Sequence, residues 1–478
     1  MVLKVVVLVL YVLILAAIAL WASRRIANVG DFFIAGRGVG PWVSAFAYGT
    51  TYFSAVMFVG YAGNLGWGFG VNTLWIVAGN AFVGSLLAWL LLAERTRTMT
   101  AHLDAITMPE FLSERYACKP LRPLSAVVIF LFLLPYSASV YKGLGHLFEV
   151  NLGVEYIYVE IAMAAVTGVY LLFGGYLAIT LTDFFQGLVQ IFGVVVMVVL
   201  LVAPLGGLVG AFTQATAPGN APALAAPWPP AEAASAGAAL ASGSFPGWMV
   251  LTSLVIITSL GVFGLPQMVQ KFYSIKRVAD IRPAMIISTV FAIVIAGGAY
   301  FSGALSHLHF TPEQIKAMDP DMIMPQLLAD STPQWFSALI LVVVLAASMS
   351  TLSSLVLVAS AAVSIDFLGL RVRGEGADPK GVVVLRVLCG IFIALSVVIA
   401  GAKVTFIVNL MVISWGALAG CFMAPYVYGL FWRRATLPGA VASMVVGLGS
   451  AITLFLLWGA KGVPVAGAVA MLLPLIVM

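Results

Sequence analysis

Long apolar segments that recur along most of the chain are the feature that most constrains its fold. Thirteen stretches carry few charges, and most of them have the roughly 20 residues that a helix needs to cross a bilayer. Only 9% of the 478 residues are charged, whereas soluble domains carry about 25%. We therefore expect an all-α integral membrane protein with about 13 transmembrane helices, at residues 4–22, 41–64, 71–92, 123–148, 155–174, 180–203, 247–270, 283–306, 335–366, 381–401, 404–430, 437–458 and 463–478.

Positive charge is distributed unevenly between alternate loops. With the N-terminus outside, 18 of the 23 Lys and Arg residues fall on the inner side, and Lys271 is counted among them. Cytoplasmic loops typically carry such an excess. We expect a multi-pass protein of the plasma (bacterial inner) membrane with its N-terminus outside. The lipid bilayer is then a partner, and the basic clusters predict no binding to nucleic acid.

Composition divides the chain into five parts. Residues 205–246 are rich in Ala, Pro, Ser and Gly and lack Lys and Arg, which is typical of a flexible linker, here an external one. The linker separates two groups of five spans, at 41–204 and 247–431. Residues 1–40 would add an N-terminal helix, read as an uncleaved anchor, and a cytoplasmic loop. Residues 432–478 would supply the C-terminal helices.

Two of the spans contain residues that interrupt a helix. Glycine and hydroxyl residues fall at 49–54 in the second span, and Gly and Pro fall at 261–266 in the seventh. Free backbone groups are costly in lipid, so such breaks tend to line cavities. Gly and Pro are also common in ordinary membrane helices. As a matched pair in two halves, however, the breaks predict a transporter with a ten-helix inverted-repeat (5+5) core.

The ninth span carries a run of hydroxyl side chains at residues 348–354. Ala347, Ser350 and Thr351 stand at positions i, i+3 and i+4, so one helix face offers two hydroxyl oxygens. Such hydroxyls can instead serve helix packing or bond back to their own helix. Together with the free carbonyls expected at residues 50–53, they would form a set of neutral oxygens suited to sodium.

Asp183 and Lys142 are charged residues within spans, and each has two interpretations. Asp183, followed three residues later by Gln186, fits a helix N-cap, but an intramembrane carboxylate is also a functional candidate. Lys142 could extend to the outer membrane interface, or it could pair with the carboxylate of a substrate. No cysteine or histidine spacing indicates a metal site or a disulfide framework.

Several of these motifs together resemble the sodium:solute symporter family, which includes sodium/proline, sodium/pantothenate and sodium/galactose symporters. The resemblance covers nearly the whole chain. It implies thirteen helices, of which the first is additional to the ten-helix core. The matching segments are residues 31–37, 50–54, 174–178, 182–186, 263–266 and 350–351.

The resemblance also implies a set of site residues. Sodium would bind backbone oxygens of Thr50, Phe53 and Ala347 and side-chain oxygens of Ser350 and Thr351. Asp183 matches an aspartate that supports cation binding from the neighbouring helix and, in some members, a second sodium ion. The solute is expected beside the same break, at Tyr52, Ser54, Tyr136, Lys142, Phe263 and Gln267.

Three positions differ from the proline transporters of this family. Those proteins carry an aspartate where this chain has Tyr52, and aromatic residues where it has Thr258 and Val262. The stretch 52–55 is more similar to the pantothenate branch.

We therefore expect a sodium-coupled secondary active symporter that imports a small organic solute (a carboxylate, vitamin, amino acid or sugar) by alternating access. Sodium is the expected coupling ion, no other cofactor is expected, and the chain is not expected to be an enzyme. A proton-coupled symporter of the same fold is an alternative, as is a transporter-like sensor or channel. A sensor would need a long soluble signalling segment and a channel a continuous polar pore, and neither is visible in the sequence.

Overall fold

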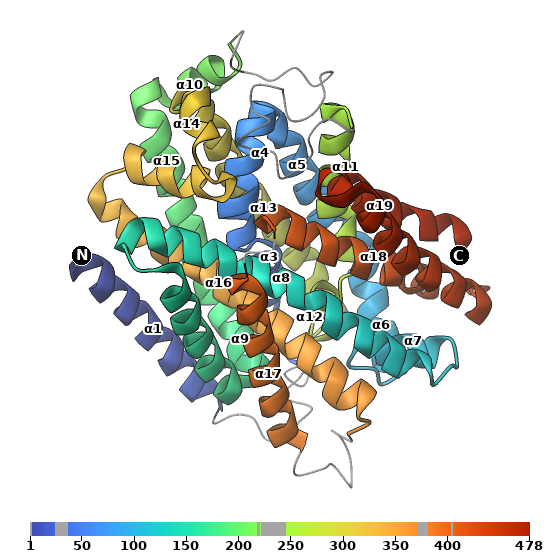
Figure 1. Cartoon of the computed structure of the whole chain (residues 1–478). Coiled ribbons are helices and arrows are strands. Elements are labelled where there is room, and N and C mark those ends of the chain that lie inside the picture. The colour runs from blue at the N-terminus through green and yellow to red at the C-terminus, as the bar shows by residue number, and fades with distance from the viewer. Residues whose placement is uncertain (1, 24–36, 218–219, 221–244, 371–380, 403–404) are drawn as a thin grey trace.

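The computed structural model describes residues 2–23, 37–217, 220, 245–370, 381–402 and 405–478 (Figure 1). These residues form helices and short connections, and the extended pairing among them is a single parallel bridge between Val39 and Ile275. The all-α class is confirmed. The α-helices are α1 (Val2–Ser23), α3 (Pro41–Tyr52), α4 (Ala62–Phe69), α5 (Leu74–Ala78), α6 (Glu94–His102), α7 (Met108–Arg115), α8 (Leu121–Leu152), α9 (Tyr156–Val202), α10 (Gly207–Ala215), α11 (Gly247–Leu260), α12 (Pro266–Tyr273), α13 (Ile281–Ala304), α14 (Pro312–Lys316), α15 (Ile323–Ser331), α16 (Gln334–Ala361), α17 (Gly381–Gly401), α18 (Ile407–Phe431) and α19 (Leu437–Val477).

Short π- and 3-10 helices connect or extend these elements. A π-helix takes one residue more per hydrogen-bonded turn and is frequent at functional sites. The π-helices are η2 (Val56–Tyr61), η4 (Gly79–Leu87), η5 (Trp89–Ala93) and η11 (Ala362–Phe367), and the 3-10 helices are η3 (Gly70–Thr73), η6 (Ala203–Leu205), η7 (Gly261–Phe263), η8 (Val278–Asp280), η9 (Leu305–Leu308) and η10 (Pro320–Met322).

In the part of the chain that the structure describes, ten helical stretches are long and apolar enough to cross a membrane, and two shorter apolar helices lie at Tyr156–Gly168 and Gly462–Val477. The thirteen expected spans differ from these helical stretches mainly in the N-terminal half. There Val56–His102 is one continuous helical stretch of 47 residues. Near the C-terminus the expected division is present. Gly459 has φ 57 and ψ −159, which bends α19 between its two apolar halves.

Burial separates an inner set of helices from an outer one. In the most apolar window of α16 and of α18, 94% of residues are buried, against 17% for α1. Figure 1 shows α8 and α16 crossing the middle of the molecule, with α1 and α19 at opposite edges. Most residues of α16 and α18 therefore contact other helices, and α1 lies outside this inner set.

Three sequence expectations need correction or fall outside the described residues. Part of the expected linker is helical, because α10 forms at Gly207–Ala215; residues 221–244 lie outside the described part, as do 24–36. Lys271, which we counted as a loop cation, is 1% exposed in the last turn of α12. The loops themselves therefore carry one positive charge fewer than the sequence suggested.

The second half of the first broken span is held by an unusually close helix crossing. A Cβ atom at Gly303 of α13 would lie 1.8 Å from the carbonyl oxygen of Ala62, and one at Gly66 of α4 would lie 2.2 Å from the carbonyl carbon of Gly303. Small residues let membrane helices approach in this way. Only glycine at these two positions allows the observed contact between α4 and α13.

We expect Gly303→Ala to lower the melting temperature of the purified protein by several degrees, because overpacking of this kind costs about 1–3 kcal/mol. Gly449→Ala is the matched control, since a Cβ at Gly449 of α19 would meet nothing within 4 Å. Equal melting temperatures for the two variants would show that the crossing tolerates a methyl group.

Candidate functional site

The first break lies between α3 and η2. Phe53 leaves the helical conformation (φ −109, ψ 101), and its N–H is donated to the carbonyl of Gly49. The next helical stretch begins where Met57 donates its N–H to the carbonyl of Ser54. The last carbonyls of a helix have no partner within it, so those of Thr50 and Thr51 must be satisfied by other elements.

The second break lies between α11 and α12. It contains η7 and then Leu265 in an extended conformation (φ −85, ψ 119), and α12 begins at Pro266, which has no N–H to satisfy. The two breaks meet, because the Tyr52 hydroxyl donates to the carbonyl of Thr258 on α11. Both expected interruptions are therefore present, and they lie side by side.

The hydroxyl face of α16 satisfies the end of α3. Ser350 Oγ lies 3.0 Å from the Thr50 carbonyl oxygen, and Thr351 Oγ1 lies 3.3 Å from the carbonyl oxygens of both Thr50 and Thr51. The same hydroxyls lie 3.0 and 3.1 Å from the carbonyl oxygen of Ala347. Four of the five expected sodium-binding residues therefore bring their oxygens together, and Phe53 is the residue at which α3 ends.

This cluster has more acceptors than protons. Each hydroxyl carries one proton, yet each has at least two carbonyl oxygens within reach. The cluster is fully buried, since Thr50, Ser350 and Thr351 are 0% exposed. A cation among these oxygens would use the spare lone pairs. Its position at the C-terminal end of α3 would also be favoured by the helix dipole.

Asp183 lies next to this cluster, not at a helix N-terminus. It sits well inside α9, so the N-cap interpretation is wrong. Its Oδ2 is 3.3 Å from the Nζ of Lys271, and that ammonium donates to Ser354 Oγ at 2.9 Å. Ser354 Oγ is in turn 3.1 Å from Thr51 Oγ1. A chain of polar contacts thus connects the aspartate to the first break.

A small cavity borders the break at Tyr52, Phe53 and Ser54. Its volume of about 20 Å³ has room for about one water molecule. Tyr52 stacks on Phe53 at 4.4 Å and on Trp415 at 6.2 Å, and its hydroxyl is 3.2 Å from Asn80 Oδ1. The cavity is lined by Tyr52, Phe53, Ser54, Met57, Tyr61, Asn80, Thr258, Tyr300, Met411 and Trp415, none of which carries a charge.

Two of the six expected solute residues, Tyr52 and Ser54, line this cavity. Tyr136 lies one layer behind, with its ring edge-on to Trp415 at 5.8 Å. Phe263 and Gln267 are buried but are not among the lining residues. Asn80 and Trp415 were missed; the signal for Asn80 was an amide in an otherwise apolar span.

Lys142 is buried in an ion pair, which neither interpretation of the sequence anticipated. Its Nζ lies 2.8 Å from Asp321 Oδ2 and 3.0 Å from the Thr405 carbonyl oxygen. The residue is 4% exposed, so its ammonium does not extend to the surface. Asp321, in η10, also accepts the N–H of Ile407 at 3.2 Å. This pair connects α8 to the segment before α15 and to the start of α18.

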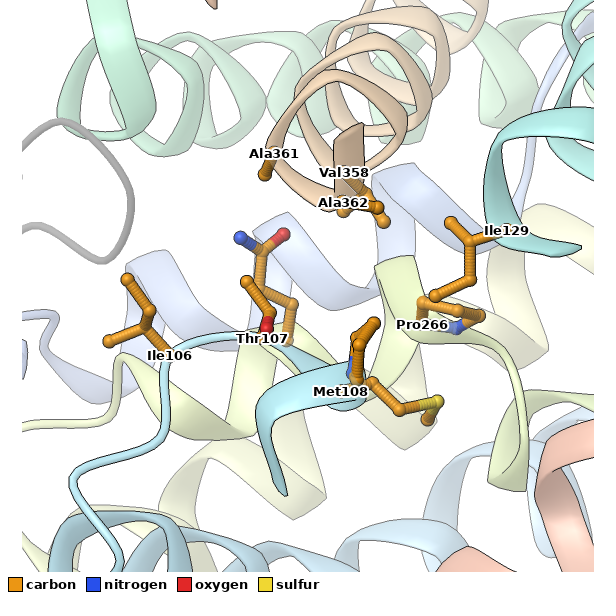
Figure 2. A pocket seen from close by; sticks show the side chains of 10 residues that line it. Ile106, Thr107, Met108, Ile129, Pro266, Val358, Ala361 and Ala362 are labelled. Atoms are coloured by element: carbon orange, nitrogen blue, oxygen red, sulfur yellow. The ribbon is translucent and has the colours of Figure 1, made fainter. Parts of the chain in front are cut away.

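A second charged cluster closes a different part of the molecule. Arg122 of α8 contacts Asp366 of η11 at 2.8 Å and Glu110 of α7 at 3.0 Å, and Thr107 donates to Asp366 at 2.9 Å. A small pocket lies beside it. Figure 2 shows Thr107 and Met108 on one side of the pocket and Val358, Ala361 and Ala362 on the other, where α16 passes into η11. Pro266 of α12 lies at the edge of the pocket.

The chain is similar to known membrane transporters along most of its length. Residues 32–447 match the sequence pattern of the sodium:solute symporter family. The chain is 28% identical over 469 residues to the osmoregulated proline transporter OpuE of Bacillus subtilis (strain 168), covering 97% of this chain and 90% of that one. It is 31% identical over 451 residues to a sodium/proline symporter of Staphylococcus aureus, covering 91% and 83%.

Solved structures show the same fold. The chain superimposes on the substrate-bound, outward-open state of a Na+-coupled sialic acid symporter with a TM-score of 0.77 at 16% identity, covering 99% of this chain and 96% of that one. The TM-score is 0.53 at 14% identity with the inward-facing conformation of Mhp1, covering 92% and 90%. At such identities the likeness concerns the fold alone. With a family match that spans most of its length, the chain belongs to the sodium:solute symporter family, whose members are membrane transporters and not enzymes.

Proposed function

We propose that this chain is a sodium-coupled symporter that imports a small organic solute by alternating access. The observation that carries the proposal is the double use of one broken helix. Thr50 and Thr51 present carbonyl oxygens to the hydroxyls of α16, and Tyr52 to Ser54 line the small cavity. Unwound backbone that binds a coupling ion beside the solute is the arrangement that transporters of this architecture use.

Sodium binds, in this proposal, to backbone oxygens of Thr50, Phe53 and Ala347 and to the hydroxyl oxygens of Ser350 and Thr351. Bound sodium would replace the hydrogen bonds that now join α16 to α3. It would thereby order the break before the solute arrives, so the solute would not bear that ordering cost. By reciprocity, the solute must tighten sodium binding by the same factor.

The driving force is sufficient for concentrative uptake. One positive charge moving through 100 mV releases about 2.3 kcal/mol, and a tenfold sodium gradient adds about 1.4 kcal/mol. The sum of about 3.7 kcal/mol corresponds to several hundredfold accumulation of a neutral solute per sodium ion.

The cavity favours a compact solute without net charge, such as a zwitterion. Aromatic rings surround it, and its described lining carries no charged side chain. A carboxylate on the solute would be favoured at the start of η2, where the helix dipole is positive. There it would compete with Ser54, which accepts the N–H groups of Val56 and Met57. The relatives named as proline transporters and the family's pantothenate branch therefore supply the first solutes to test.

We further propose that the fold is organised as two inverted repeats within thirteen spans. The repeats are 41–204 and 247–431, preceded by 1–40, joined by the external segment 205–246 and followed by 432–478. Support comes from the two matched breaks and from the bend at Gly459. The protein would lie in the plasma membrane with its N-terminus outside. The Lys142–Asp321 pair and the Arg122–Asp366–Glu110 cluster would then close the outer and inner mouths of the solute path.

The sodium site can be tested by removing two of its about five oxygens. We expect Ser350→Ala with Thr351→Ala to raise the sodium concentration for half-maximal uptake at least tenfold and to abolish concentrative uptake. Ser396→Ala is the control, since this buried hydroxyl only bonds back to Phe392 at 2.8 Å in α17. The measurement is solute binding to purified protein in sodium and in choline. Undiminished sodium enhancement in the double variant would refute the site.

The solute cavity can be tested separately. Asn80→Leu removes one polar lining group, and with it one of the two oxygens near the Tyr52 hydroxyl, the other being the Thr258 carbonyl. We therefore expect the KM for the solute to rise at least tenfold. Stabilisation by sodium alone should persist, because the sodium oxygens are untouched. The solute is first identified by an uptake screen of labelled amino acids, carboxylates and sugars in sodium and in choline medium. If the variant has the same KM as the parent protein, the solute does not bind in this cavity.

The membrane orientation predicts where inserted reporters will be found. A reporter within residues 205–246 should be accessible from outside, and one near Arg373 should be accessible only from inside. Protease protection of the two fusions in intact cells and in inverted vesicles provides the measurement. Both reporters on one side would contradict the proposed orientation.

A further inference from the structure

Lys271 is a lysine without access to solvent, placed at the meeting point of four helices. Its ammonium contacts Asp183 of α9 at 3.3 Å and Ser354 of α16 at 2.9 Å, and it lies 5.5 Å from the centre of the Tyr176 ring. Through Ser354 it reaches Thr51 at the end of α3. Each of these groups is one that would also stabilise a small inorganic cation: a carboxylate, a hydroxyl and an aromatic face.

This region offers more oxygen than the ammonium uses. Asp183 Oδ1 is buried and has no hydrogen-bond partner among the described residues. Gln186, on the same face of α9 at i+3, is 0% exposed, and both atoms of its amide likewise have no described partner. Asp183 Oδ1 and the Gln186 amide oxygen could therefore bind a cation in addition to the contacts that the Lys271 ammonium makes.

The region is adjacent to the proposed sodium site. Ser354 stands four residues after Ser350 and three after Thr351, so all three lie on one face of α16. Thr51 belongs to both regions, since its carbonyl oxygen is 3.3 Å from Thr351 Oγ1 and its hydroxyl is 3.1 Å from Ser354. Two cations, one exchangeable and one covalently attached, can therefore act on consecutive residues of the same broken helix.

We propose that the Lys271 ammonium is a built-in cation that occupies a second cation site formed by Asp183, Ser354 and the Thr51 hydroxyl. The inference rests on the proposed sodium-coupled function and specifies its stoichiometry. The ammonium neutralises Asp183 and repels a second free ion, so one sodium ion is bound per transport cycle. Because the ammonium belongs to α12, it connects α3, α9 and α16 to the second broken helix. It does so without the transport of a second sodium ion down its gradient.

Replacing the ammonium should convert this region into a sodium site. In Lys271→Gln, Asp183 keeps its charge and gains a free position beside it. We expect radioactive sodium to bind at two ions per chain in this variant and at one in the parent. The Hill coefficient of sodium-dependent stabilisation should rise from about 1 towards 2, the limit set by the number of sites. The probes are sodium, potassium and choline chlorides on the purified full-length protein.

Two further variants make the result specific. Lys271→Gln with Asp183→Asn removes both charges and should return the stoichiometry to one sodium ion. Lys276→Gln makes the same substitution five residues later at an exposed position and should behave as the parent. If Lys271→Gln can be purified only in sodium, and neither in potassium nor in choline, the dependence supports a sodium ion in place of the ammonium.

The outcomes separate this inference from the proposed function. One sodium ion per chain in Lys271→Gln, or a variant that folds in none of the three salts while the double variant folds, would overturn the built-in cation. Two ions per chain in the parent would also overturn it. A parent that binds no sodium at all would instead overturn the proposed sodium-coupled function.

Discussion

The satisfaction of a few backbone carbonyls inside an apolar molecule is the constraint on which the rest of this structure depends. A bilayer supplies no hydrogen bonds, so a helix that ends within it needs partners from other helices. At the end of α3 those partners are the hydroxyls of Ser350 and Thr351. They can be there only because α16 is almost wholly enclosed by neighbouring helices. These hydroxyls stabilise the break by bonding to its carbonyl oxygens. A cation could compete with them for the same carbonyl oxygens.

Three ion pairs join helical segments that are far apart in the sequence, and in two of the pairs both side chains are at most 5% exposed. They join residues 179, 88 and 244 positions apart: Lys142 with Asp321, Lys271 with Asp183 and Arg122 with Asp366. Such pairs contribute little net stability, because desolvation offsets the attraction, but loss of one partner leaves a costly unpaired charge. Apolar contacts alone do not fix the relative position of these segments. In a chain with so few charges, the ion pairs act chiefly as specific connections between them.

The sequence predicted those features that depend on local pattern. Apolar length predicted the membrane class, and glycine and proline placed both breaks. The spacing of Ala347, Ser350 and Thr351 predicted a face that does reach Thr50. Of the two interpretations of Asp183, the N-cap is wrong, and local spacing could not show this because it does not reveal that α9 continues through the residue. The ion pairs of Lys142 and Lys271 were not predicted for a related reason: their acidic partners lie far away in the sequence, and only the folded chain brings them together. The cavity lining from Asn80, Thr258 and Trp415 likewise combines three distant spans.

The small size of the cavity beside the first break has a consequence for water. With room for about one water molecule, it can hold neither a hydrated ion nor a column of water. In the alternating-access cycle proposed above, a carrier in this form would therefore take almost no water with it when it returns without solute. A membrane could then hold many copies of this protein without gaining a water leak.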